Sequence, residues 1–346
     1  MAPVSQLGAS IALFYQSNRD LVERTFIAIG LAVLVGSLLH GQPVYPADWT
    51  MLLVAAVVVA GLYDPLAGYL AAVAISVWPL WQLSPYLATL FLAVAVLARG
   101  RLLRSLSWAL LVTASPMLAW LLVAAIVPLL AGLLLSPAAA FWVGVAAASW
   151  LKLAGGMAGM QPDLLTLHQE PIFVSAVAAR FAGANSLSAL QRLVAPFAGD
   201  ATFLLLDILQ VLGWGLCASL VAWLRQQRWA ELRPAWSLIV ALLGGTSVAV
   251  GTLFLLPVWL QVAPLRLLWS DPMVVVGALF SAWLAGASYW LRYLLHRPVR
   301  RLRWRSVPAA AGPIPNVTAG RGPAASAPRP APSSESGGDV IMLELD

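Results

Sequence analysis

Residues 235–260 read AWSLIVALLGGTSVAVGTLFLLPVWL, a stretch of 26 residues without a charged side chain. About 20 mostly apolar residues are enough for a helix to cross the hydrocarbon core of a membrane, so this stretch predicts a transmembrane helix. The whole chain has the same character, since 61% of its 346 residues are hydrophobic and only 10% are charged. A soluble domain carries about 25% charged residues. The sequence therefore predicts an all-α fold, a polytopic bundle of transmembrane helices.

Prolines, charges and polar loops bound the other predicted spans. These spans cover residues 25–39, 49–63, 66–82, 85–98, 201–224 and 272–295. Residues 106–159 are also almost entirely apolar, but Pro116, Pro128 and Pro137 interrupt them. This stretch contains either three short spans or one span and a re-entrant pair, because proline is tolerated where neighbouring helices satisfy the freed carbonyls. The total is then about ten spans or about eight.

Arginine positions indicate how the spans are oriented, because cytoplasmic loops of membrane proteins carry an excess of Arg and Lys. Three arginine clusters lie on predicted loops or ends, at residues 99–104, 225–233 and 297–305. The loop 40–48 has no Arg or Lys. We therefore expect both termini in the cytoplasm and residues 160–200 outside, although Arg180 and Arg192 do not follow the rule. The abundance of Arg and Ala is typical of GC-rich bacteria, so we expect a bacterial plasma (inner) membrane.

We expect five segments along the chain. They are cytoplasmic residues 1–24, an N-terminal membrane bundle 25–159, an extracytoplasmic amphipathic segment 160–200, a three-helix membrane part 201–295 and a cytoplasmic tail 296–346. In the amphipathic segment, apolar residues at helical spacing predict two short helices, within residues 170–181 and 186–193. Such helices either form a lid or a docking face, or simply connect two spans along the membrane surface.

Two ionisable residues inside predicted spans form a candidate polar pair. Lys152, the single lysine of the chain, lies near the outer end of its span, and Asp207 lies about two turns into the span that starts outside. Ionisable groups are costly at membrane depth, so both are functional candidates. Because their depths are similar they can pair, which offsets much of the burial cost. The alternatives are a Lys152 that reaches the headgroups and an Asp207 that is hydrated near the interface.

The residue pattern predicts no catalytic, cofactor-binding or metal site. His40, His168 and His296 are scattered, and the single cysteine, Cys217, excludes an internal disulfide or a cysteine metal cluster. There is no Walker A loop, kinase glycine loop or Ser-His-Asp order. We therefore expect no enzymatic activity. A net charge of +6 on a membrane protein indicates contact with anionic lipid headgroups rather than with nucleic acid.

The tail combines a basic stretch, a low-complexity stretch and an apolar end. The basic anchor consists of Arg297, Arg300, Arg301, Arg303 and Arg305. It sets the topology or contacts anionic lipid. Residues 306–338 are rich in Pro, Ala, Gly and Ser, and we expect them to be disordered. The terminal octamer consists of Asp339, Val340, Ile341, Met342, Leu343, Glu344, Leu345 and Asp346. It is either a docking motif for a cytoplasmic partner or an ordinary terminus.

The middle of the chain resembles a known kind of membrane module. Residues 77–86 read VWPLWQLSPY, and residues 128–134, PLLAGLL, run into a Gly/Ala-rich helix that ends in WLKL at 150–153. Over residues 64–225 this resembles the polytopic membrane module attached to some bacterial serine/threonine protein kinases. The helix after residue 137 is similar to substrate-binding subunits of energy-coupling-factor vitamin transporters. We expect no kinase domain in this chain, so the first resemblance implies a kinase or phosphopeptide-binding partner on a separate chain.

Two functions follow as expectations. The first is a non-enzymatic membrane protein that anchors or recruits a cytoplasmic partner, or joins a larger membrane complex, through the terminal octamer. The second is a membrane transport component that binds a small solute between its proline-broken helices, because transporters place substrates at broken helices. In that case the segment 160–200 is the lid.

Overall fold

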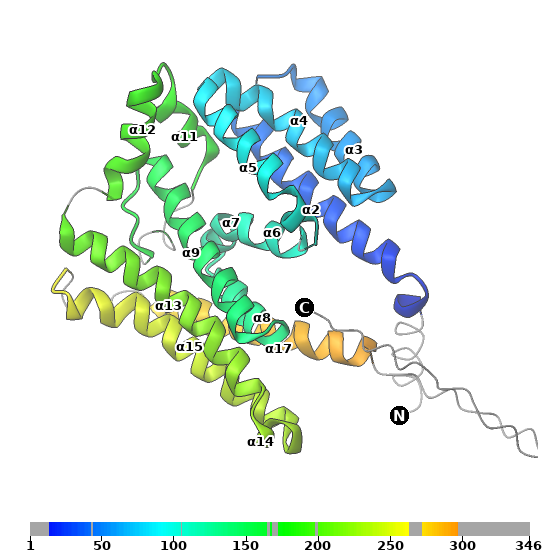
Figure 1. Ribbon diagram of the computed structural model, residues 1–346, viewed down its shortest axis with the longest axis vertical. Coiled ribbons are helices and arrows are strands. Elements are labelled where there is room, and N and C mark those ends of the chain that lie inside the picture. Colours follow the sequence, from blue (N-terminus) through cyan, green and yellow to red (C-terminus); the bar gives the residue numbers. More distant parts are fainter. Residues whose placement is uncertain are drawn as a thin grey trace, which may run out of the picture. The chain divides into compact units, whose positions relative to one another are not determined.

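The computed structural model describes residues 14–42, 44–104, 106–164, 167, 172–197, 200–262 and 272–296, and these residues form helices joined by short turns, without a strand. The eight long helices are α2 (Arg19–Gly41), α3 (Ala47–Tyr63), α4 (Pro65–Leu83), α5 (Pro85–Arg104), α9 (Pro137–Ala158), α13 (Ala201–Arg225), α15 (Pro234–Trp259) and α17 (Pro272–His296) (Figure 1). The basic anchor, residues 306–338 and the terminal octamer lie outside the described residues.

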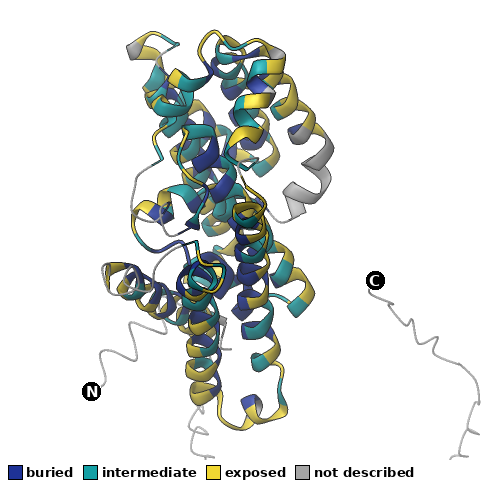
Figure 2. Ribbon diagram, turned by 90° about the vertical axis from the view of Figure 1, so that its left-hand side faces the viewer, coloured by how far each residue is buried: buried dark blue, intermediate teal, exposed yellow. Residues whose placement is uncertain are grey.

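Six of these helices, α2, α4, α9, α13, α15 and α17, are long and apolar enough to cross a membrane. Their outward sides carry large apolar residues, such as Trp142 and Trp283 at 68% and 64% exposure. Figure 2 shows the buried residues along the inward sides of the helices and the exposed residues on their outer sides. An apolar outer surface of this extent needs a lipid environment. The chain is thus an all-α polytopic membrane protein.

Prolines define several helix starts. Pro65, Pro137 and Pro234 each occupy the first turn of a helix, where the missing N–H is not needed. At the first of these, the chain turns at Asp64, whose side chain accepts a hydrogen bond from the amide of Ala67 at 3.2 Å. This cap explains why α3 and α4 are separate helices rather than one.

The stretch 106–159 contains one full-length helix, α9, preceded by three short ones. These are α6 (Leu106–Thr113), α7 (Ser115–Trp120) and α8 (Ile126–Leu134). At 1.5 Å per residue they rise about 12, 9 and 14 Å, whereas the hydrocarbon core is about 30 Å thick. None of the three can cross alone. Within residues 106–159, only α9 is therefore long and apolar enough to cross a membrane.

The break between α7 and α8 lies directly against α17. Leu122 adopts a left-handed conformation with φ 59°, and the amide of Val123 donates to the carbonyl of Leu118 at 2.8 Å. This closes α7 as glycine usually does at a helix end. A Cβ on Gly277 of α17 would lie 2.3 Å from the carbonyl oxygen of Leu122. Only glycine permits this approach, so α17 holds the break in place.

Contacts at the helix ends define two faces of the bundle. At the terminal face, the side chain of Gln16 donates to the carbonyl of Leu295 at 3.0 Å, so the start of α2 lies beside the end of α17. At the loop face, Gly41 at the end of α2 lies against Val174 of α11 (Val174–Phe181). The described chain thus begins and ends at one face, and the 160–200 segment lies at the other.

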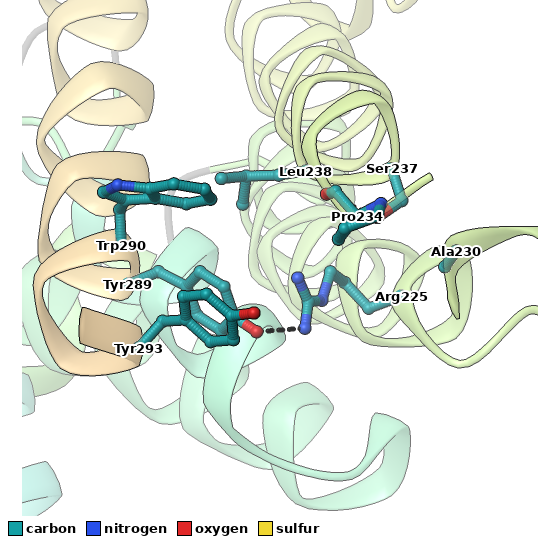
Figure 3. Close-up of a pocket in the computed structure, with 8 residues that line it drawn as sticks. All are labelled: Arg225, Ala230, Pro234, Ser237, Leu238, Tyr289, Trp290 and Tyr293. Atoms are coloured by element: carbon teal, nitrogen blue, oxygen red, sulfur yellow. Dashed lines mark hydrogen bonds between the residues drawn. The ribbon is translucent and has the colours of Figure 1, made fainter. Parts of the chain in front are cut away.

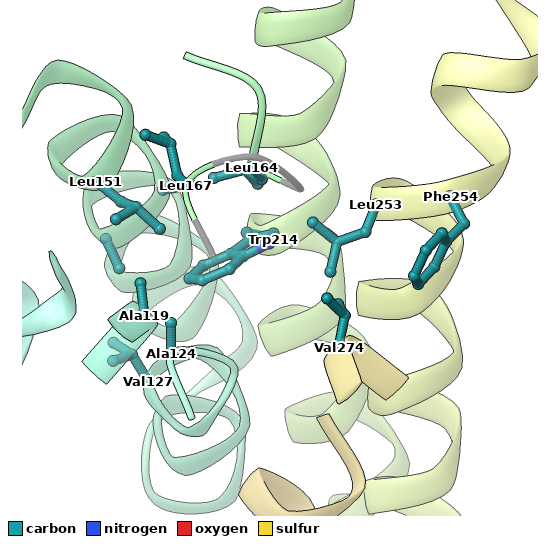
Figure 4. Packing of buried hydrophobic residues seen from close by; sticks show 12 residues of the cluster. Ala119, Ala124, Val127, Leu151, Leu164, Leu167, Trp214, Leu253, Phe254 and Val274 are labelled. Atoms are coloured by element: carbon teal, nitrogen blue, oxygen red, sulfur yellow. The ribbon is translucent and has the colours of Figure 1, made fainter. Parts of the chain in front are cut away.

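The segment expected to be amphipathic forms α11, α12 (Ser186–Val194) and a 3-10 turn, η1 (Ala195–Phe197). Asn185 caps α12 by accepting from the amide of Ser188 at 2.9 Å. The packing of the long helices crosses the expected boundary at residue 159, because α9 packs mainly against α13, which packs in turn against α15. Trp214 of α13 is fully buried among residues of α7, α8, α9 and α15 (Figure 4).

Candidate functional site

The structure brings Lys152 and Asp207 together. Each lies six residues from the loop-face end of its helix, Lys152 from Ala158 and Asp207 from Ala201. Six residues correspond to a depth of about 9 Å. The ammonium nitrogen of Lys152 lies 2.7 Å from Oδ1 of Asp207, and the two residues are only 2% and 6% exposed. Lys152 therefore does not extend to the headgroups, and Asp207 is not an open interfacial residue.

The ammonium group of Lys152 has three acceptors. Besides Asp207, it donates to the carbonyl of Pro162 at 2.6 Å and to Oε1 of Gln210 at 2.7 Å. An ammonium has three N–H donors, so all of them are used. This coordination replaces the water that the group loses on burial, which is the condition for keeping a buried ion pair stable.

Gln210 is the centre of the polar cluster, by which we mean Lys152, Pro162, Asp163, Asp207 and Gln210. It lies three residues after Asp207, on the same face of α13, and is completely buried. Its Oε1 also accepts from the amide of Leu164 at 3.3 Å, and its Nε2 donates to Oδ1 of Asp163 at 2.7 Å. The Nε2 lies 3.4 Å from the carbonyl of Thr252 in α15 as well.

The polar cluster therefore joins α9, α13, α15 and the chain that follows α9. Packing supports it, since a Cβ on Gly213 would lie 2.1 Å from Cγ2 of Thr252. This contact brings α13 close enough to α15 for Gln210 to reach the carbonyl of Thr252. With both carboxylates ionised, the cluster has two negative charges and one positive charge. Asp163 is only partly buried, so the excess charge lies toward the loop face.

Two cavities flank the short helix α6. The amphipathic cleft, about 760 Å³, lies between α2, α6 and α17, and the apolar cavity, about 510 Å³, lies between α2, α4, α5, α6 and α9. Leu110 of α6 lines both. Because α6 rises only about 12 Å, it cannot fill the full depth of the bundle between α2 and its neighbours. The short length of α6 thus accounts for both spaces.

The lining of the amphipathic cleft changes in character along its depth. The polar or charged lining residues Tyr15, Arg19, Glu23, Ser288 and Arg292 lie toward the terminal face, where Leu291 and Leu295 also line the cleft. Deeper residues are apolar: Phe26, Ile27, Gly30, Leu111 and Ala114. Arg19 and Glu23 form an exposed ion pair at 2.9 Å. The apolar cavity differs, because nearly all of its lining is aliphatic or aromatic, and the hydroxyl of Tyr69 is bonded to the carbonyl of Ala95 at 3.0 Å.

A third, smaller pocket of about 200 Å³ lies where α13, α15 and α17 meet at the terminal face (Figure 3). We call it the arginine pocket. Its lining consists of Arg225, Ala230, Pro234, Ser237, Leu238, Tyr289, Trp290 and Tyr293. The guanidinium of Arg225 lies 4.2 Å from the centre of the Tyr289 ring, and Nη2 also donates to the Tyr289 hydroxyl.

Among the described residues, no group of three or more His, Cys, Asp and Glu side chains is placed to hold a metal ion. Of the candidates from sequence, Lys152 and Asp207 meet, while the basic anchor and the terminal octamer lie outside the described residues. Sequence reasoning did not identify Gln210 or Arg225 as site residues. The available signal for Gln210 was its position one helical turn after Asp207 inside an apolar span.

Comparisons with protein-family models, with curated proteins and with solved structures gave no match for this chain.

Proposed function

We propose that this chain is a non-enzymatic membrane transport component that binds an amphipathic molecule, such as a membrane lipid, in the amphipathic cleft. The observation that carries the proposal is the gradient of the cleft lining, from Arg19 and Arg292 at the terminal face to Phe26 and Leu111 at depth. A lipid has the same gradient, with a charged headgroup and apolar chains. The cleft is also within the size range of ligand pockets, about 300–1,000 Å³.

The two parts of the cleft have different roles in this proposal. Apolar lining alone gives little affinity, because lipid chains in the bilayer are already in an apolar medium. Selectivity must therefore come from the polar end. Arg19, Glu23 and Arg292 together carry one net positive charge, which favours an anionic headgroup. The apolar part holds one chain away from the bulk bilayer, where α6 leaves room for it.

The test is the lipid that remains bound to the full chain after purification in mild detergent, measured by native mass spectrometry. Ser107, an exposed residue on α6, lines the cleft, so Ser107→Trp fills the cleft and is expected to abolish the bound lipid. Ser247→Trp is the matched control, since Ser247 is an exposed serine on α15 away from the described cavities. Equal lipid retention by both variants and by the unmodified chain refutes the proposal.

A second function is favoured by the sequence of the tail. The terminal octamer, Asp339 to Asp346, is apolar and acidic and follows a stretch poor in apolar residues. Such a segment suits addition of a strand to the sheet edge of a partner. We propose that it recruits a cytoplasmic signalling protein, the partner class that the sequence resemblance implies. Deletion of the octamer should then remove a protein from affinity pull-downs of the full chain, and an unchanged set of captured proteins excludes this role.

A further inference from the structure

The arginine pocket has the chemistry of a phosphate site. Nε of Arg225 is buried and has no hydrogen-bond partner, and no carboxylate pairs with this guanidinium in the part of the chain that the structure describes. Figure 3 shows the guanidinium directed from α13 toward the aromatic residues of α17. An arginine that keeps unused donors in a partly enclosed space matches an anion with several oxygens, because its planar fork fits phosphate geometry.

The described side chains that line the pocket include no carboxylate, and α14 (Arg228–Leu232) beside it carries Glu231 as well as Arg228. Arg228 and Arg233 are exposed on the turn around α14, next to Arg225. Pro234 and Ser237 belong to the first turn of α15, and the N-terminal end of a long helix favours anions. Tyr289 covers one side of the guanidinium and holds it through Nη2, which fixes the direction of the remaining donors.

Size and position identify the source of the phosphate. At about 200 Å³ the pocket is smaller than the usual range for whole organic ligands, about 300–1,000 Å³. It therefore accepts a compact group whose remainder stays outside. Trp229, Trp236 and Trp290 are exposed around it, as is typical of residues at the level of lipid headgroups. A phosphate carried by a lipid reaches this depth with its chains along the outer surface of α15 and α17.

We propose that the arginine pocket binds the phosphate of an anionic membrane lipid in the leaflet at the terminal face. This site is separate from the amphipathic cleft, which has Arg292 and not Arg225 in its lining. The lipid phosphate takes the unused donors of Arg225, and the aromatic residues of α17 hold the glycerol part. The lipid then joins the terminal-face ends of α13, α15 and α17.

The experiment measures binding of phosphatidylglycerol to the full chain in nanodiscs of phosphatidylcholine. Arg225→Gln should weaken binding at least about tenfold, because it removes a charge-assisted bond. Arg228→Gln is the control, since it removes the same charge from the neighbouring exposed turn, and it should change the affinity by less than about threefold. Equal effects of the two variants overturn the proposal, because they indicate only a diffuse surface attraction.

Two further arms keep the result decisive. Arg225→Lys retains the positive charge but not the planar guanidinium, so it should also weaken lipid binding. If Arg225→Gln does not fold in phosphatidylcholine alone, Arg225→Lys is compared with the control in its place. Inorganic phosphate at millimolar concentration should neither bind alone nor displace the lipid. Displacement by inorganic phosphate overturns the assignment to lipid and identifies a site for the free anion.

Discussion

Replacing Asp207 with asparagine tests how the polar cluster holds the bundle together. The substitution keeps the size of the side chain and one oxygen acceptor for Lys152, but it removes the negative charge 2.7 Å from the ammonium. Lys152 is 2% exposed, so water cannot replace the lost charge. The carbonyl of Pro162 and the amide oxygen of Gln210 remain as neutral acceptors. The variant therefore leaves the buried ammonium without a directly bonded carboxylate, and the remaining negative charge of the cluster is that of Asp163, which is bonded to Gln210.

The expected loss follows from the burial of the pair. Removing one partner of a buried ion pair costs about 3–5 kcal/mol of unfolding free energy, whereas an exposed pair contributes about 0–1 kcal/mol. In the double variant Lys152→Met and Asp207→Asn the buried ion pair is absent, and the charge that remains is that of Asp163, which is only partly buried and accepts from Gln210. The carbonyl of Pro162 then lacks its donor, which costs about 1–3 kcal/mol. The double variant should thus be more stable than Asp207→Asn alone, and its loss should be well below the sum of the two single losses.

The measurement is the free energy of unfolding of the full chain in mixed micelles, titrated with a denaturing detergent and followed by tryptophan fluorescence. Asp48→Asn is the matched control, because Asp48 is exposed in the first turn of α3 and its loss should change stability by less than about 1 kcal/mol. The reasoning is refuted if Asp207→Asn costs no more than this control, or if the double variant loses as much as the two single variants added together.

Three other substitutions test the helix packing and the helix ends through the same unfolding measurement. Gly277→Ala should lower stability by about 1–3 kcal/mol, because its Cβ would lie 2.3 Å from the backbone oxygen of Leu122, and an unchanged stability contradicts the close contact at the break. Gly251→Ala should instead raise stability by up to about 1 kcal/mol, since its Cβ would meet nothing nearer than 3.7 Å and alanine favours a helix; a loss here means that the space is not open. Gln261→Gly should raise stability by about 0.5–1 kcal/mol, because Gln261 is exposed at φ 58° after α15; a decrease shows that its side chain contributes more than the strain costs.

The polar cluster suggests why the loop-face ends of the helices stay together without a continuous helix between them. In the chain after α9, Pro162 and Asp163 are tied to α9 and α13 through Lys152 and Gln210. Leu164 and Leu167 then enter the same buried core as Trp214 (Figure 4). Hydrogen bonds of the polar cluster and the apolar core around Trp214 therefore stabilise the same segment. We expect loss of the hydrogen bonds to weaken the packing of Leu164 and Leu167 as well.

The class of the protein and most of its helix bounds follow from local features of the amino-acid sequence. Apolar length and charge content are local properties, and membrane crossing depends on little else. The predicted break at Asp64 and Pro65 is present because it needs only a proline and a cap. Lys152 and Asp207 were conspicuous for the same local reason, since an ionisable group stands out in an apolar span.

What these residues contact, and where space remains between the helices, depends on packing between distant parts of the chain. The partners of Lys152 include Gln210, 58 positions away, and a neutral amide gives no local signal of that role. The break between α7 and α8 lies where Leu122 and Gly277 meet through packing between distant helices. The cavities beside α6 and the pocket at Arg225 also arise from packing. Each is surrounded by several helices, so no single segment of the chain predicts it.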